Sequence, residues 1–82
     1  MKRIVKTRNQ TIFANETIMP EGYSGWRAQN IGTGDVEVDG FVLHPGDVLD
    51  YTSIDKDVVW DSPIVVVVKP YGALRVARLK YV

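Results

Sequence analysis

The chain has no cysteine and a single histidine, His44, among its 82 residues. Without thiols it cannot form a disulfide or a thiolate metal site, and one imidazole cannot supply a multi-histidine site within one chain. A domain this small buries only about 60% of the surface of its unfolded chain, so such domains usually rely on a disulfide, a metal or a partner subunit. The composition therefore favours association with another subunit.

Long apolar segments are also absent. The longest apolar run is Ile64–Val68, which is far shorter than the roughly 20 residues that span a bilayer. The basic start at Met1–Lys6 lacks the apolar stretch of a signal peptide. We therefore expect no membrane partner, synthesis in a cytoplasm, and a location in the virion if the protein is viral.

The formal net charge is zero, but the charges are unevenly distributed. Both ends of the chain are basic, whereas segment 35–61 carries eight acidic residues against Lys56 alone. Basic and acidic strands could lie side by side within one fold, or the basic edge of one subunit could meet the acidic face of the next. We expect no nucleic-acid partner, because backbone binding requires an uncompensated basic surface.

Short apolar stretches separated by Gly, Pro, Asn and Asp predict an all-β chain, and no stretch has a helical stripe. We predict one domain over residues 1–82, a small antiparallel β-sandwich or partly open barrel of about seven to nine short strands. Segment 15–25 is the longest predicted loop. The expected strands are 3–7, 11–14, 26–31, 35–39, 41–43, 48–53, 58–60, 64–69 and 73–81.

Two tight turns follow each other near the centre. Asp39-Gly40 is a preferred pair for a type I′ hairpin, because both central residues need positive φ. This turn places Val38 opposite Phe41 and Val36 opposite Leu43 on one face, with Glu37 and Val42 on the other. Pro45-Gly46 then predicts a type II turn. We assign Asp39, Gly40, Pro45 and Gly46 structural roles.

Segment Ile64–Val68 is apolar at every position. In a two-layer domain each strand has one outer face, so Val65 and Val67, or their alternates, should point outward. An exposed apolar ribbon tends to aggregate unless something covers it. This segment is the main sequence argument for self-association.

The last strand changes phase along its length. Leu74 and Val76 fall on one face, but Leu79 and Tyr81 fall on the other. A β-bulge near Ala77-Arg78 would reconcile the two halves. Alternatively, the strand leaves its own sheet there and pairs elsewhere.

No motif with catalytic chemistry is evident. His44, with Asp47 nearby, could be a base or a metal ligand, but no motif supplies a nucleophile or second acid, so we expect a turn histidine, no enzyme activity and no cofactor. The alternating acids at 35–39 could bind calcium, but a solvated acidic face is the better interpretation. The Gly32–Gly34 loop lacks the lysine and helix of a phosphate-binding loop and is interpreted as a turn.

The aromatic residues allow two interpretations. Trp26 and Trp60 are expected in the core, since small sandwiches commonly bury tryptophan. Tyr23 and Tyr71 lie beside Gly22 and Gly72 and are the better candidates for outward contact. Together such residues could form a platform for sugar, so a small carbohydrate- or ligand-binding module is the alternative function.

The segments Asn30-Ile31-Gly32, Asp35–Gly40 and Leu43–Asp47 together resemble a pattern in small virion proteins of tailed bacteriophages. In these proteins a strand ending in Asn-x-Gly leads into a Val-x-Val-(Asn/Asp)-Gly hairpin and a Leu-x-Pro-Gly turn. The resemblance covers about residues 26–54. It implies a β-sandwich that decorates a capsid, forms a neck or tail part, or trimerises a fibre.

We therefore predict a non-enzymatic structural protein that forms a homo-oligomer through β-edge and apolar strand contacts. Its partners would be copies of itself and other structural proteins of a larger assembly. A cupin-like enzyme is a third hypothesis, based on the His44–Asp47 turn. The residues expected to make oligomer contacts are Val65, Val67, Arg3, Lys6, Arg75, Arg78 and Tyr81.

Overall fold

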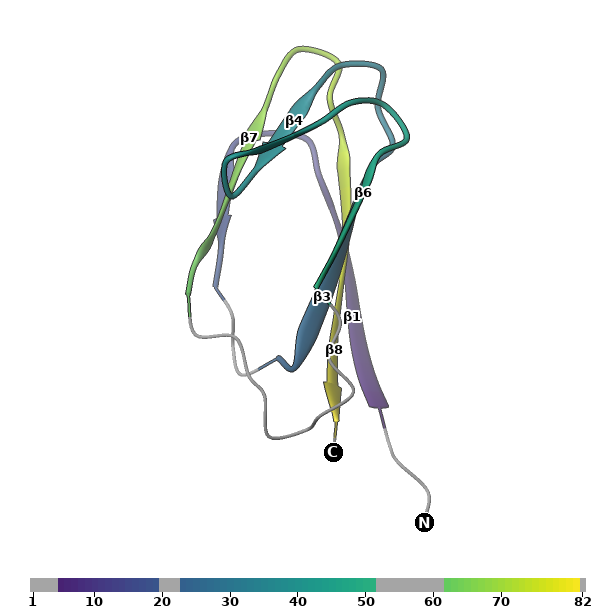
Figure 1. Cartoon of the computed structure of the whole chain (residues 1–82), viewed down its shortest axis with the longest axis vertical. Coiled ribbons are helices and arrows are strands. Elements are labelled where there is room, and N and C mark those ends of the chain that lie inside the picture. Colours follow the sequence, from purple (N-terminus) through teal and green to yellow (C-terminus); the bar gives the residue numbers. More distant parts are fainter. Residues whose placement is uncertain (1–4, 20–22, 52–61, 82) are drawn as a thin grey trace.

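The computed structural model describes the backbone of residues 5–19, 23–51 and 62–81, and the side chains of 7–19, 23–51 and 62–80. Eight strands in these residues form two four-stranded antiparallel sheets (Figure 1). The prediction of an all-β fold consistent with a small antiparallel sandwich is confirmed. Two expected features, the strand at 58–60 and the buried Trp60, lie outside the described residues.

The two sheets differ in length and in strand order. Sheet A, on the right in Figure 1, has the order β1 (Val5–Ile12), β8 (Leu74–Tyr81), β3 (Gly25–Asn30), β6 (Val48–Tyr51). Sheet B, on the left, has the order β2 (Glu16–Ile18), β7 (Ile64–Val68), β4 (Val36–Val38), β5 (Phe41–Leu43). The described edge strands are therefore β1 and β6 in sheet A, and β2 and β5 in sheet B.

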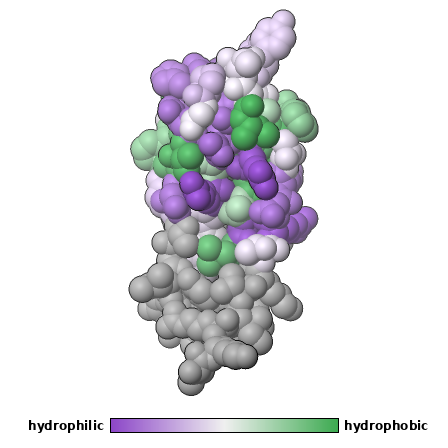
Figure 2. Space-filling view, turned by 90° about the vertical axis from the view of Figure 1, so that its right-hand side faces the viewer, coloured by the Kyte–Doolittle hydropathy of each residue, from purple (hydrophilic) through white to green (hydrophobic). Residues whose placement is uncertain are grey.

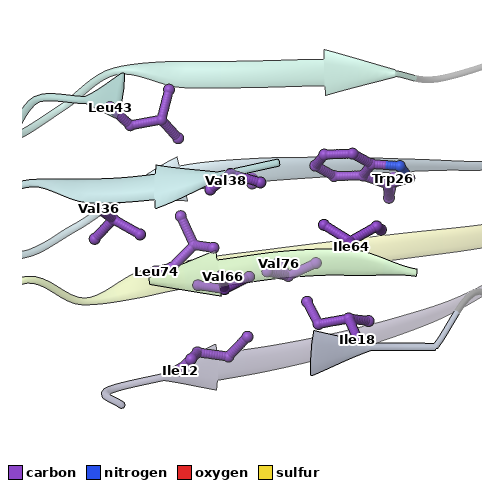
Figure 3. Packing of buried hydrophobic residues seen from close by; sticks show 11 residues of the cluster. Ile12, Ile18, Trp26, Val36, Val38, Leu43, Ile64, Val66, Leu74 and Val76 are labelled. Carbon is purple, nitrogen blue, oxygen red and sulfur yellow. The ribbon is translucent and has the colours of Figure 1, made fainter. Parts of the chain in front are cut away.

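Alternating residues of both sheets meet in one apolar core (Figure 3). Trp26 is 2% exposed, as predicted, and its ring lies 4.9 Å from that of Tyr51, centroid to centroid. In β7 the even-numbered residues Ile64 and Val66 point inward, so one face of this apolar strand is buried in the core. The buried members of this cluster are Ile12, Ile18, Trp26, Ala28, Val36, Val38, Leu43, Ile64, Val66, Leu74 and Val76.

Two boundaries differ from the sequence prediction. The expected strands 3–7 and 11–14 are parts of one strand, β1, and β2 lies inside the segment predicted as a loop. β1 pairs on one side only, with β8, and the polar residues that join its two halves are exposed at Arg8 and Asn9, whereas half-buried Gln10 is satisfied by Arg78. β2 has three residues, of which Ile18 alone is buried, so it has too little alternation to be recognised.

The central hairpin and the following turn are as predicted. Asp39 has φ 51° and Gly40 has φ 86°, the positive values that a type I′ turn requires. Val36 pairs with Leu43 and Val38 with Phe41. In the next turn Gly46 has φ 88°, and the Asp47 amide donates to the His44 carbonyl at 2.9 Å, as in a type II turn.

The bulge predicted near Ala77-Arg78 is absent from β8. Its register with β1 runs without interruption from Val5↔Tyr81 to Ile12↔Leu74, and its register with β3 is equally regular. The pleat is kept because Arg78, not Leu79, occupies the inward position after Val76, and it is 3% exposed. The apparent change of phase is therefore a buried arginine rather than an extra residue.

The loops at the upper end of Figure 1 pack backbone against backbone. The amides of Thr33 and Gly34 both donate to the Tyr71 carbonyl, at 2.9 and 3.0 Å, and the Lys69 amide donates to the Asp35 carbonyl at 3.0 Å. A Cβ at Gly34 would collide with the Pro70 carbonyl. Close approach, rather than phosphate binding, explains this glycine, in agreement with the predicted turn.

Candidate functional site

The outer face of sheet B carries Val65 and Val67, one of the two alternating sets that the sequence left open for the outward face. Val65 is 49% exposed, whereas Val67 is half-buried. Glu37 pairs with both Val42 and Val67, so a carboxylate lies between these two valines. On the neighbouring strand β2, the polar residue Thr17 pairs with Val65. The outward valines are therefore interspersed with polar side chains, and this face is less apolar than the sequence of β7 alone indicates.

The edge strand β5 is a more continuous apolar feature. Phe41 is 52% exposed and Val42 is 48% exposed, although they point to opposite faces of sheet B. β5 contains neither a charged residue nor a proline. Each of the other three described edge strands carries at least one charged residue: Lys6 and Arg8 in β1, Glu16 in β2, and Asp50 in β6. Charge on an edge is a usual protection against strand addition, and β5 lacks it.

The main chain of β5 is also arranged to accept another strand. In a two-residue hairpin the residues that flank the turn form a hydrogen-bonded pair, and such pairs alternate with non-hydrogen-bonded ones. Val38–Phe41 and Val36–Leu43 are therefore bonded pairs, and Val42 opposite Glu37 is not. The N–H and C=O groups of Val42 consequently point away from β4, toward the open side of the sheet.

His44 lies at the end of β5 and forms a local polar cluster. Its Nδ1 is 3.0 Å from Oδ1 of Asp35, and its backbone amide donates to Oδ2 of Asp47 at 2.9 Å. The hydrogen bond to Asp35 raises the pKa of His44 above its usual value of 6.5, and the negative charges of Asp35 and Asp47 act in the same direction. The His44 side chain is 69% exposed. The cluster stabilises the turn at the end of β5.

The alternating acids of segment 35–39 are separated in the fold. Asp35 faces His44, Glu37 lies on the outer face of sheet B, and Asp39 forms the hairpin turn. Within residues 5–19, 23–51 and 62–81, no three His, Cys, Asp or Glu side chains are grouped so that they could hold a metal ion.

The basic residues expected at an oligomer contact lie in different places. Arg78 requires a correction, because it is buried: Nη1 donates to the Met19 carbonyl at 3.4 Å and Nη2 to Oε1 of Gln10 at 3.2 Å. Arg75 is exposed on the outer face of sheet A. Lys6 and Tyr81 belong to β1 and β8, but their side chains, like all of Arg3, lie outside the described residues.

The two tyrosines proposed for outward contact do not form one platform. Tyr71 is 85% exposed, as expected, in the turn before β8, whereas half-buried Tyr23 lies before β3 with its ring 5.1 Å from Cζ of Arg78. The backbone beside Tyr23 bonds to the far end of β8, where the Ser24 amide donates to the Leu79 carbonyl. The tyrosines thus lie near opposite ends of sheet A, too far apart to hold one sugar ring.

Sequence reasoning missed the exposure of Phe41 and the position of β5 as an edge among the described strands. The hairpin pattern gives the register of β4 and β5. The order of strands across sheet B decides which of the two lies at the edge of the described sheet and which lies inside it. The one available signal is that β5, unlike its counterparts, contains no charge or proline.

Comparison with known proteins returned no family model, no curated protein and no solved structure that matches this chain. Among the described residues, no helix is long and apolar enough to cross a membrane. The candidate function consequently rests on the geometry of the two sheets and their edges.

Proposed function

We propose that this chain is a non-enzymatic structural protein that assembles by joining the β5 edges of two copies. The observation that carries the proposal is an uncharged edge strand among the described residues, with two half-exposed apolar side chains, Phe41 and Val42, and with the main-chain groups of Val42 directed away from β4. Adding a strand at such an edge supplies main-chain hydrogen bonds and covers apolar surface at the same time.

A two-fold axis through Val42 suits this edge. Antiparallel pairing would place Val42 opposite Val42 of the second copy, and Phe41 opposite its Leu43. The main-chain groups of Val42 then bond across the axis, and sheet B becomes one continuous sheet that runs through both copies. Phe41 points to the core side of sheet B, next to the edge of the apolar cluster that contains Leu43. Pairing would therefore cover Phe41 at the point where the two cores meet.

The setting that we propose is a virion of a tailed bacteriophage. It is supported by the resemblance in residues 26–54, where the hairpin and the Pro45-Gly46 turn have the expected backbone angles. In such a particle the chain would contact copies of itself and other structural proteins. Capsid, portal or tail genes beside the gene for this chain would support the setting, and an unrelated metabolic operon would contradict it.

Cysteine cross-linking tests the edge contact directly, because the natural chain has no cysteine. In a bonded antiparallel pair the Cα atoms lie about 5.5 Å apart, within the range of a disulfide. We expect Val42→Cys to form a covalent dimer under mild oxidation. The matched control is Val48→Cys, at a similarly exposed valine on the edge strand β6 of sheet A. Equal cross-linking of both variants would contradict the proposed contact.

Light scattering after size-exclusion chromatography gives an independent test. We expect the unmodified chain to elute at micromolar concentration with twice its monomer mass of 9.2 kDa. Val42→Lys should return it to the monomer, because two like charges would face each other across the axis. Val48→Lys should leave the dimer intact. A monomer at all concentrations, with a reversible unfolding transition, would argue against self-association.

A further inference from the structure

The outer face of sheet A contains a hollow of about 270 Å³. Figure 2 shows this side of the molecule, where polar side chains surround a few apolar ones. The hollow is lined by residues of three strands, all with odd numbers and therefore on the face opposite the core. They are Asn9 of β1, Ala77 and Arg75 of β8, and Arg27 and Gln29 of β3.

The strand register explains the shape of the hollow. Ala77 lies on β8 between Asn9 of β1 and Arg27 of β3, and pairs with both. Its methyl group is the smallest side chain of the five, so it forms the floor of the hollow, and the longer side chains of the other four residues surround it. Two residues along β8, Arg75 pairs with Gln29. The two guanidinium groups thus stand on adjacent strands, diagonally across the floor.

The chemistry of the lining is selective. Guanidinium groups bind carboxylates through two parallel hydrogen bonds, because the spacing of their N–H groups matches that of the two oxygens. The side-chain amides of Asn9 and Gln29 each offer a donor and an acceptor, which is what a sugar hydroxyl requires. None of the described residues that line the hollow is acidic.

One carboxylate lies near this site without lining it. Asp50 of β6 pairs with Arg27 on the side away from Ala77. Arg27 is therefore placed between Asp50 and the hollow, whereas Arg75 has Thr11 and Gln29 as its neighbours in register. We expect Arg75 to contribute more than Arg27 to the binding of an anion.

We propose that this hollow binds a hydroxylated carboxylate of the sugar-acid class, with Arg75 and Arg27 on the carboxylate and Asn9 and Gln29 on the hydroxyls. Its volume lies just below the usual range for ligand pockets, about 300–1,000 Å³, and suits one sugar unit rather than a long chain. The site lies on the face of sheet A that points away from sheet B, so it does not depend on the proposed β5 contact.

Titration with glucuronate, followed by the backbone amide signals of the ¹⁵N-labelled full chain in NMR, tests the proposal. We expect saturable shifts centred on residues 27–29 and 75–77, with a dissociation constant on the order of millimolar. Methyl glucoside lacks the carboxylate and acetate lacks the hydroxyls, so each compound measures how much the missing group contributes to binding. Both should bind roughly tenfold more weakly than glucuronate, because each lacks one half of the recognised groups.

Two substitutions test the geometry. Arg75→Gln should weaken glucuronate binding roughly tenfold, since it removes a charged partner. Lys69→Gln is the matched control, because Lys69 is an exposed cation in the turn before β8 and does not line the hollow. Ala77→Leu should also abolish the shifts, because it fills the floor without changing charge. An unchanged spectrum elsewhere in each variant would verify its fold.

Several results would overturn the assignment. Acetate or sulfate binding as tightly as glucuronate would identify a general anion site. Equal losses in Arg75→Gln and Lys69→Gln would indicate a nonspecific charge effect, and full binding by Ala77→Leu would exclude the hollow. Shifts that do not saturate would exclude a site altogether. Val42→Lys should bind glucuronate normally, so failure here is distinguishable from failure of the proposed assembly.

Discussion

The side-chain Nδ2 of Asn30 donates a 2.9 Å hydrogen bond to the carbonyl of Leu43, and this bond joins the two sheets, since Asn30 ends β3 and Leu43 ends β5. The same nitrogen donates to the Gly34 carbonyl at 2.8 Å, and Oδ1 accepts from the Gly32 amide at 3.0 Å. With 1% of its surface exposed, Asn30 satisfies three backbone groups, two in the loop after β3 and one at the end of β5.

Asn30→Ala should reduce the free energy of unfolding by about 3 kcal/mol, because it leaves buried backbone groups without partners. Gln29→Ala is the control: it removes an adjacent but exposed amide and should change stability by less than about 0.5 kcal/mol. Urea denaturation followed by tryptophan fluorescence measures both. Similar midpoints for the two variants would show that the Asn30 bonds do not hold the sheets together.

Two glycines should respond very differently to alanine. Gly40 has φ 86°, and a Cβ added there would meet only open space, so Gly40→Ala should cost about 1–2 kcal/mol from backbone strain alone. At Gly34 a Cβ would meet the Pro70 carbonyl, and two loops would have to separate. Gly34→Ala should therefore lower the free energy of unfolding by about 3 kcal/mol or more. Thermal denaturation measures the stability of both variants. A lower midpoint for Gly40→Ala than for Gly34→Ala would contradict the predicted order.

Arg78→Ala should destabilise the fold by at least about 2 kcal/mol. The guanidinium is buried, donates to Met19 and Gln10, and stacks over Tyr23, so its loss removes hydrogen bonds and packing together. The control is Arg75→Ala on the same strand but the outer face, which should change stability by less than about 0.5 kcal/mol. Chemical denaturation measures the free energy of unfolding of both variants. Equal losses for Arg78→Ala and Arg75→Ala would refute the inward placement of Arg78.

The Asp35 contact should give His44 a pKa above 6.5 in the folded chain. Because the folded-state pKa is raised, the pair stabilises the fold fully below the unfolded pKa and loses this contribution as the pH rises through the folded value. NMR titration of the single imidazole measures the pKa without ambiguity of assignment. Asp35→Asn should remove most of the rise, and high salt should reduce it, since the pair is exposed. A value at or below 6.5 would contradict the contact.

Local backbone chemistry made part of the fold predictable. The two central turns need residues with positive φ, which Asp39-Gly40 and Gly46 adopt with little strain, so their turn types followed from residue identity, and the hairpin register followed from the turn. That alternate valines of β7 point outward also followed from the two-residue period of a strand, and the structure decided that Val65 belongs to the outward set. These features depend on neighbours in the sequence and are insensitive to the rest of the chain.

The candidate site was only partly predictable. Self-association through a β edge was expected, but the sequence pointed to the apolar face of β7 and to basic residues, not to β5. The hollow on sheet A could not be anticipated, because Asn9, Arg27 and Ala77 become neighbours only through the order β1-β8-β3. No spacing in the sequence encodes that order.

The sequence by itself determined that this chain is all-β, where its two central turns lie, and that it has no thiol or histidine cluster for chemistry. The tertiary structure decided that Arg78 is buried, that β8 needs no bulge, and that β5 is an edge strand among those that the structure describes. The physical reason is that turns depend on the φ preferences of adjacent residues, whereas burial and edges depend on strands distant in sequence. An arginine can lie inside a sheet pleat only where other segments supply its acceptors, here the Met19 carbonyl and Gln10.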